Sequence, residues 1–345
     1  MRRRHVWESE SGLGLSSATS LPWRIKAKLL ADDCALLRLI TLVLLALFAI
    51  SFYMFEGIGP RPDFVLPRRA LRVVSMVLVA AAVAYSSVVF QTITANRILT
   101  PSVIGFEAIY MFIQTVIVFS LGGGSFLITG TPNFLVSVAA MMVFSLGVYQ
   151  IMFRLEGQNI YFILLVGMVL GIMFGSLTTF MQMTIDPSEF FIIQNRVFAS
   201  FNAVNQYLIT IAAVSVGVIL LLCIPLTKYL DVMALGREHS MSLGVNHLRL
   251  SRMLLIVIAV LVAVSTALVG PVTFLGVLVT NLTYQFMRTY KHRYILPACI
   301  AVTTISLVGG QYLVSRVFNF GINLSVVINF VGGIYFMYLL LKESR

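Results

Sequence analysis

The chain has 345 residues, of which 59% are hydrophobic and 11% are charged. Soluble domains carry about 25% charged residues, so this composition excludes an ordinary soluble domain and indicates an all-α polytopic membrane protein. The net charge of +11 is not organised into a basic groove with aromatic platforms, so it predicts no nucleic-acid partner.

Residues 1–35 precede the apolar part of the chain and are predicted to form a cytoplasmic leader. The leader opens with three arginines, continues through a Ser/Gly-rich stretch and has no signal-peptide apolar core before Leu36. From Leu21 to Arg38, apolar and basic residues are interleaved. This pattern fits either an amphipathic segment at the membrane surface or a solvated, partly disordered leader, and both alternatives stay open.

Ten apolar segments follow and define a predicted transmembrane domain, 36–345. They cover residues 36–55, 70–90, 103–121, 134–152, 160–180, 207–226, 252–270, 272–287, 295–313 and 325–341. The eighth segment is short and follows the seventh through Gly270-Pro271 alone, so we expect a hairpin or a broken helix that is buried in protein at membrane depth. The longest outer connection, 181–206, is expected to hold a short helix at the outer surface.

Lysine and arginine are distributed unequally between the two sides that ten spans would define. If the N-terminus is cytoplasmic, eighteen of these residues lie on the cytoplasmic side and six on the outer side. Positive charge accumulates in cytoplasmic loops, so both termini are predicted to be cytoplasmic. The same topology predicts a multi-pass protein of the inner (cytoplasmic) membrane and places residues 226–252 in the cytoplasm.

Residues 226–252 form the longest charged interruption between two predicted spans. A helix about 16 Å long is predicted from Val232 to Ser242. Asp231 is placed to cap its start, and Gly244 is placed to stop it. Such a helix is too short to span a membrane.

One face of this predicted helix suits docking into a partner protein. Met233, Arg237 and Met241 would share that face at four-residue spacing. Arg237 and Glu238 would be available for charged contacts. The alternative is an ordinary cytoplasmic loop between two spans.

Motifs for catalysis are missing from the chain. There is no GxxxxGK[ST] phosphate loop, so ATP is not expected to bind here by that route. The 3 cysteines lack CxxC spacing and the 4 histidines share no helical face, so no disulfide framework, metal site or bound cofactor is expected. No catalytic triad or carboxylate pair can be built within the spans, so an enzyme is not expected.

Neutral polar residues dominate the polar content of the predicted spans. Glu107 is essentially the only ionisable residue there, which argues against a proton- or sodium-coupled carrier. Gln91, Thr94, Asn281 and Gln285 are therefore candidates to line a wide path for a large ligand. The alternative is that such residues form hydrogen bonds between helices.

Four motifs in combination resemble the permease subunits of ATP-binding-cassette (ABC) importers for iron–siderophore complexes, haem and cobalamin, the FecCD-type family. The motifs are Gln91-Thr-Ile-Thr-Ala-Asn96-Arg97-Ile-Leu-Thr-Pro101-Ser-Val-Ile-Gly105, Leu235-Gly236 with Ser242-Leu243-Gly244-Val245, Gly270-Pro-Val-Thr-Phe-Leu-Gly276-Val-Leu-Val-Thr-Asn281 and Lys291-His292-Arg293-Tyr-Ile-Leu-Pro297. Family members usually have Asn-Pro where this chain has Asn96-Arg97, and Pro-His where it has Thr280-Asn281. These variants look like the ferric-siderophore branch.

The resemblance implies the type II permease fold of ABC importers together with a set of partners. A second permease subunit, identical or different, would complete a path along the shared interface. Two ATPase subunits, the only ones to bind ATP, would lie on the cytoplasmic side. A periplasmic or lipoprotein substrate-binding protein would dock on the outer side.

The resemblance also assigns roles to residues of this chain. By position, residues 232–245 look like the coupling helix that enters a groove of the ATPase. Its candidate contacts are Met233, Leu235, Gly236, Arg237, Glu238, Ser240, Met241, Leu243 and Gly244. Arg69, Arg72 and Arg316 match arginines that the family presents to acidic residues of the binding protein. The alternatives are snorkelling for Arg69 and Arg72, and neutralisation of helix carbonyls for Arg316.

The function expected from the resemblance is uptake of a ferric siderophore, driven by ATP hydrolysis on a partner subunit. The alternatives are an ABC permease for haem or cobalamin, a secondary transporter that works alone and a structural membrane scaffold. A P-loop ATPase and a secreted binding protein encoded in neighbouring reading frames would favour the ABC importer.

Overall fold

The computed structural model describes residues 23–57, 62–128, 130–154, 160–197, 200–201, 205–318 and 322–343, and every regular element within these ranges is a helix. The α-helices are α1 (Trp23–Phe55), α2 (Pro62–Thr94), α3 (Phe106–Leu121), α4 (Gly130–Arg154), α5 (Ile160–Gln182), α6 (Pro187–Val197), α7 (Gln206–Cys223), α8 (Thr227–Met233), α9 (Arg237–Ser242), α10 (His247–Val269), α11 (Leu275–Met287), α12 (His292–Arg316) and α13 (Leu324–Glu343). The 3-10 helices are η1 (Pro101–Ile104), η2 (Phe126–Ile128) and η3 (Ile224–Leu226). The predicted all-α fold class is confirmed.

Each of the ten predicted spans falls on an α-helix, but these helices differ in length. Among the described residues, 8 helices are long and apolar enough to cross a membrane. The helices at the third and eighth predicted spans are shorter, with 16 residues in α3 and 13 in α11. The number of complete spans and the side that the termini face therefore stay predictions.

No helix end marks the predicted boundary between leader and first span. α1 runs without a break from Trp23 to Phe55, so the last part of the predicted leader is helical and continuous with the first span. The preceding part of the leader, residues 1–22, lies outside the described residues.

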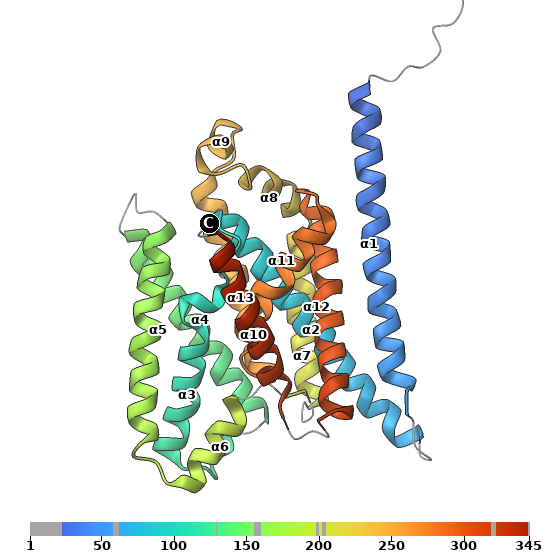
Figure 1. The fold of residues 1–345 in the computed structure, drawn as a ribbon. Coiled ribbons are helices and arrows are strands. Elements are labelled where there is room, and N and C mark those ends of the chain that lie inside the picture. The colour runs from blue at the N-terminus through green and yellow to red at the C-terminus, as the bar shows by residue number, and fades with distance from the viewer. Residues whose placement is uncertain are drawn as a thin grey trace, which may run out of the picture.

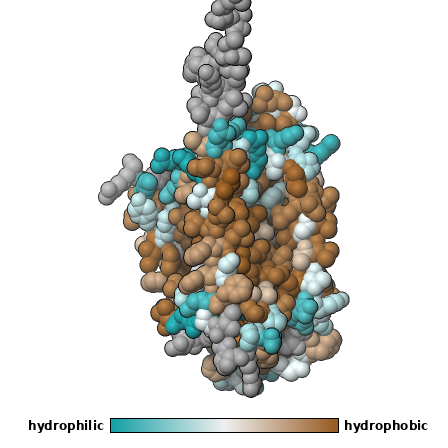
Figure 2. Space-filling model, turned by 90° about the vertical axis from the view of Figure 1, so that its right-hand side faces the viewer, coloured by the Kyte–Doolittle hydropathy of each residue, from teal (hydrophilic) through white to brown (hydrophobic). Residues whose placement is uncertain are grey.

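The helices form a bundle with distinct ends, and α8 and α9 lie at one end while α6 lies at the other (Figure 1). The described chain begins with α1 and finishes with α13 toward the α9 end, as an even number of spans requires. Figure 2 shows an apolar surface across the middle of the molecule and hydrophilic side chains toward both ends. This distribution suits a protein whose middle is surrounded by the hydrocarbon of a bilayer.

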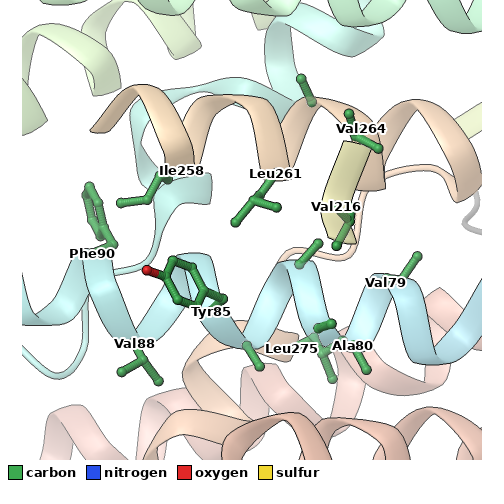
Figure 3. Packing of buried hydrophobic residues seen from close by; sticks show 14 of the residues in the cluster. Val79, Ala80, Tyr85, Val88, Phe90, Val216, Ile258, Leu261, Val264 and Leu275 are labelled. Carbon is green, nitrogen blue, oxygen red and sulfur yellow. The ribbon is translucent and has the colours of Figure 1, made fainter. Parts of the chain in front are cut away.

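α2 is the central helix of the bundle. From Val79 to Thr94 nearly every residue is buried, because α7, α10, α11 and α12 all pack against this helix. The stretch is rich in alanine and serine, which let neighbouring helices approach closely. Figure 3 shows Tyr85 and Phe90 of α2 beside Ile258 and Leu261 of α10. The first family motif begins at the end of this helix, so the packing of α2 fixes its position.

α11 is a short helix that packs tightly on α2. α10 ends at Val269 and the chain turns at Gly270, which has a φ of +107°. Gly276 lies so close to α2 that an added Cβ would be 2.3 Å from the Ser87 Oγ. The predicted break between the seventh and eighth spans is therefore confirmed. The short helix expected within 181–206 is also present, as α6.

Candidate functional site

The polar segment 226–252 forms two short helices, and the prediction of one helix from Val232 to Ser242 is wrong. α8 ends at Met233 and α9 starts at Arg237. Gly236 separates the two helices with a φ of 93° and a ψ of 169°, a backbone conformation that is essentially restricted to glycine. Gly244 has a φ of +83° two residues after the end of α9, so its predicted role as the stop is confirmed.

Asp231 does not cap a helix, contrary to the prediction, because it lies inside α8 and binds α12. Its Oδ1 accepts a hydrogen bond from the backbone N of His292 and another from the ring Nδ1, each 2.7 Å long. The Nε2 of the same ring is 2.8 Å from the Thr92 hydroxyl of α2. Asp231, His292 and Thr92 therefore form a polar chain that connects α8 with α12 and α2.

Met233, Arg237 and Met241 do not share an exposed face, so that prediction is wrong. Met233 is 0% exposed and packs in the main core of the bundle, whereas Met241 is 54% exposed. The turn at Gly236 rotates α9 relative to α8, so residues four apart on opposite sides of this turn do not share a helix face.

The exposed part of this segment is a compact surface at the end of the bundle. We call the exposed side chains of Leu235, Arg237, Glu238, Met241 and Leu243 the α9 surface. Large apolar side chains that are exposed beside charged ones mark protein contacts when they lie together. The α9 surface therefore has the composition of a docking surface.

Four predicted contact residues of this segment are not part of the α9 surface, namely Met233, Gly236, Ser240 and Gly244, and two of them, Ser240 and Gly236, hold its shape. Ser240 is buried, and its hydroxyl lies 3.0 Å from Nδ1 of His247 at the start of α10. Gly236 supplies the turn before α9. These residues, together with Met233, position the α9 surface without being part of it.

The three predicted docking arginines lie together at the opposite end of the bundle. They line a pocket of about 130 Å³ with Tyr53, Glu56, Tyr312 and Ser315. Arg316 donates to the Glu56 carboxylate at 3.0 Å and its side chain is 42% exposed. The structure thus adds an acidic residue, Glu56, that the sequence did not single out.

The Arg69 guanidinium binds three backbone carbonyls at the end of α1. It donates hydrogen bonds of 2.9, 3.0 and 2.8 Å to the backbone carbonyls of Tyr53, Met54 and Glu56. These carbonyls are at the C-terminal end of α1, where a cation satisfies free acceptors and the helix dipole. Arg69 therefore holds α1 against α2.

Two of the four candidate path residues, Gln91 and Asn281, connect α11 with the end of α2 and with the turn that follows it. Gln91 donates from Nε2 to the Arg97 carbonyl at 2.6 Å and to the Thr280 hydroxyl at 2.9 Å. Asn281 donates to the same Arg97 carbonyl at 3.1 Å. Thr94 donates to the Phe90 carbonyl at 2.9 Å within its own helix. All three are buried, and the bonds of Gln91 and Asn281 fit the hydrogen-bonding alternative that the sequence left open. A role on the ligand path stays a prediction for them as well.

Gln285 is placed differently from the other path candidates. It is exposed on α11, and its Nε2 donates to the Tyr335 hydroxyl of α13 at 3.0 Å. A role on a ligand path stays a prediction for this residue. Among the described residues, no three His, Cys, Asp or Glu side chains gather closely enough to hold a metal ion.

Comparison with known proteins places this arrangement among transport proteins. The FecCD transport family matches residues 35–342 of this chain. The petrobactin import system permease protein YclO of Bacillus subtilis (strain 168) is 48% identical over 310 residues, which cover 90% of this chain and 98% of that relative. The petrobactin import system permease protein FatC of Bacillus anthracis is 34% identical over 345 residues, which cover 99% of this chain and 98% of that relative.

A solved structure has the same fold. It is an inward-facing metal-chelate type ABC transporter, and it superposes with a TM-score of 0.76 over 89% of this chain and 99% of that one. The sequence identity is 21%, so this likeness concerns the fold. The predicted permease fold is confirmed.

Proposed function

The chain belongs to the FecCD transport family, and we propose that it is the permease subunit of an ABC importer that carries a ferric siderophore across the cytoplasmic membrane. The observation that carries the proposal is the 48% identity to a petrobactin import permease over 98% of that relative's length. Ferric petrobactin is therefore the first chelate to test.

Partner subunits supply what this chain lacks for the proposed transport. The α9 surface docks into a groove of an ATPase subunit, where Leu235, Met241 and Leu243 supply apolar contacts and Arg237 and Glu238 supply charged ones. Arg72 and Arg316 receive the substrate-binding protein at the opposite end of the bundle. A second permease subunit, identical or different, completes the path. Support for these partners comes from the family and from the position of the two surfaces.

In the proposed mechanism, two contacts transmit the motion of the ATPase from α8 into the bundle. The first is the buried side chain of Met233, which anchors α8 in the core. The second is the polar chain from Asp231 through His292 to Thr92, which ends on the central helix. Because both contacts are made by α8, a displacement of the α9 surface moves α12 and α2 rather than α9 alone.

The test is ATP-dependent uptake in cells that lack their own siderophore permeases. Cells receive this chain with its ATPase and binding protein and are offered iron-55 bound to petrobactin, to a hydroxamate siderophore or in haem. We expect uptake of the petrobactin complex, and no uptake when the ATPase carries an inactivating substitution in its phosphate loop. Uptake by the chain alone in liposomes with only an ion gradient would contradict the proposal and favour a secondary transporter.

A further inference from the structure

A basic pocket of about 330 Å³ lies between α1 and the turn that joins α11 to α12. Its charged lining consists of Arg38 on α1 and Arg288 and Lys291 on the turn, with one carboxylate, Asp32. Lys291 directly precedes His292, which binds α8, so the pocket lies at the α9 end of the bundle. The positive-inside distribution of charge predicts that this end is cytoplasmic.

Contacts across the pocket hold α1 against the turn. Lys291 Nζ lies 2.5 and 2.7 Å from the two carboxylate oxygens of Asp32. Arg38 donates from Nη1 to the backbone carbonyl of Met287, the last residue of α11, at 3.0 Å. Asp32 offsets one cation of the pocket, so two positive charges remain in excess.

Arg288 is the cation that these contacts leave available. It has a φ of +47° at the end of α11, a conformation that few non-glycine residues adopt. Its side chain is exposed and makes no hydrogen bond or ion pair within the described part of the chain. A guanidinium in this state, facing a pocket with further cations, is suited to a phosphate group.

Apolar surface continues from the pocket toward the middle of the membrane on both walls. Leu45 is on the same face of α1 as Arg38, two turns deeper, and is 48% exposed. Phe286 on α11 is 44% exposed, and its carbonyl lies 3.4 Å from Arg38 Nη1. A ligand with a phosphate head and apolar tails would contact both kinds of surface at once.

We propose that this pocket binds the headgroup of an anionic phospholipid of the phosphatidylglycerol type from the cytoplasmic leaflet. Basic pockets between transmembrane helices on the cytoplasmic side recognise such headgroups. The phosphodiester contacts Arg288, beside the Arg38 guanidinium that α11 holds in place, and the acyl chains lie along α1 and α11. A bound lipid ties α1 to the turn before His292 and so supports the contact with α8. The proposal is independent of the transported substrate.

The test measures lipid binding by the full-length chain, purified in detergent, with native mass spectrometry. Wild-type protein and variants are titrated with phosphatidylglycerol, phosphatidylcholine and inorganic phosphate. We expect phosphatidylglycerol to bind at least tenfold more tightly than phosphatidylcholine, and Arg288→Gln to weaken phosphatidylglycerol about fivefold, since a cation near an anionic surface contributes about that factor. Arg288→Glu should weaken it further.

Arg249→Gln is the matched control, because Arg249 is exposed on α10 at the same end and does not line the pocket. It should leave phosphatidylglycerol binding unchanged. Equal affinity for the two lipids in the wild type, or equal losses in Arg288→Gln and Arg249→Gln, would overturn the proposal. Inorganic phosphate that binds as tightly as phosphatidylglycerol and competes with it would assign the pocket to a soluble anion instead.

Discussion

Asp231 and His292 are 61 residues apart in the sequence, yet two hydrogen bonds of 2.7 Å join the Asp231 carboxylate to the His292 backbone and ring. Because a carboxylate only accepts hydrogen bonds, the ring donates from Nδ1. The ring is buried, so loss of the carboxylate leaves a donor without a partner. This pair is a polar contact between the segment that carries the α9 surface and the rest of the bundle.

Substitution Asp231→Ala is expected to destabilise the protein by about 1–3 kcal/mol, the cost of a buried polar group left unsatisfied. Thermal unfolding of the purified chain measures this loss, and uptake should fall with it. Asp231→Asn keeps the acceptor oxygen and should lose less stability. A melting temperature for Asp231→Ala equal to that of the wild type would show that the pair does not hold α8 in place.

Gly236 is expected to tolerate no other residue, although space is open around it. No atom lies within 4 Å of a Cβ added there, so the cost arises from its backbone angles and amounts to about 1–3 kcal/mol. Gly236→Asp should abolish uptake while the protein stays in the membrane, as quantified by immunoblotting of membrane fractions. Gly217→Ala in α7 also meets no atom within 4 Å and should be silent. Normal uptake by Gly236→Asp would rule out this turn as essential for coupling.

Gly276→Ala is expected to destabilise the bundle for a different reason, the lack of space. The added methyl would lie 2.3 Å from the Ser87 Oγ and 3.1 Å from the Thr100 side chain, so either the buried Ser87 side chain or α11 must move, at a cost of about 1–3 kcal/mol. Gly309→Ala in α12, where nothing lies within 4 Å, is the control. Melting temperatures of the two variants should differ by several degrees, and equal values would argue against close packing at Gly276.

Substitutions at Arg69 and at Arg316 are expected to have different effects, although both residues line one pocket. Arg69→Ala leaves three carbonyls of α1 without their donor and should lower thermal stability. Arg72→Glu combined with Arg316→Glu should instead slow association with the loaded binding protein by about tenfold at low salt, because charge steers encounter. Surface plasmon resonance measures the rate. Unchanged association in the double variant would remove both residues from the docking surface.

Gln91 and Gln285 form a second contrasting pair. Gln91→Met removes hydrogen bonds to Arg97 and Thr280 and should cost about 1 kcal/mol of stability without changing the half-saturating concentration of ferric chelate. Gln285→Met acts at an exposed position and should change that concentration without a loss of stability. If Gln91→Met instead changed the half-saturating concentration and Gln285→Met lowered stability, Gln91 would be a residue of the transport path and Gln285 a structural residue.

The structure also shows what the sequence could not decide about single residues. Gln91 is polar in an apolar span, and composition cannot distinguish a residue that lines a path from one that satisfies a neighbouring helix. Its partner Thr280 is 189 residues away, so only the packed structure reveals the contact. The prediction for Met233 failed because a periodicity argument assumes one continuous helix, whereas Gly236 interrupts it.

The sequence by itself determined the helical class, the approximate position of ten apolar segments and the break before α11, because a long apolar run has few stable structures in a bilayer. It also determined the family, because the motifs that identify the family are local in the sequence. Only the tertiary structure decided that Arg69 binds the end of α1, that Met233 is buried and that Asp231 binds His292. These contacts join residues on different helices. Their energies depend on how the helices pack, and hydropathy along a single chain carries no information on that packing.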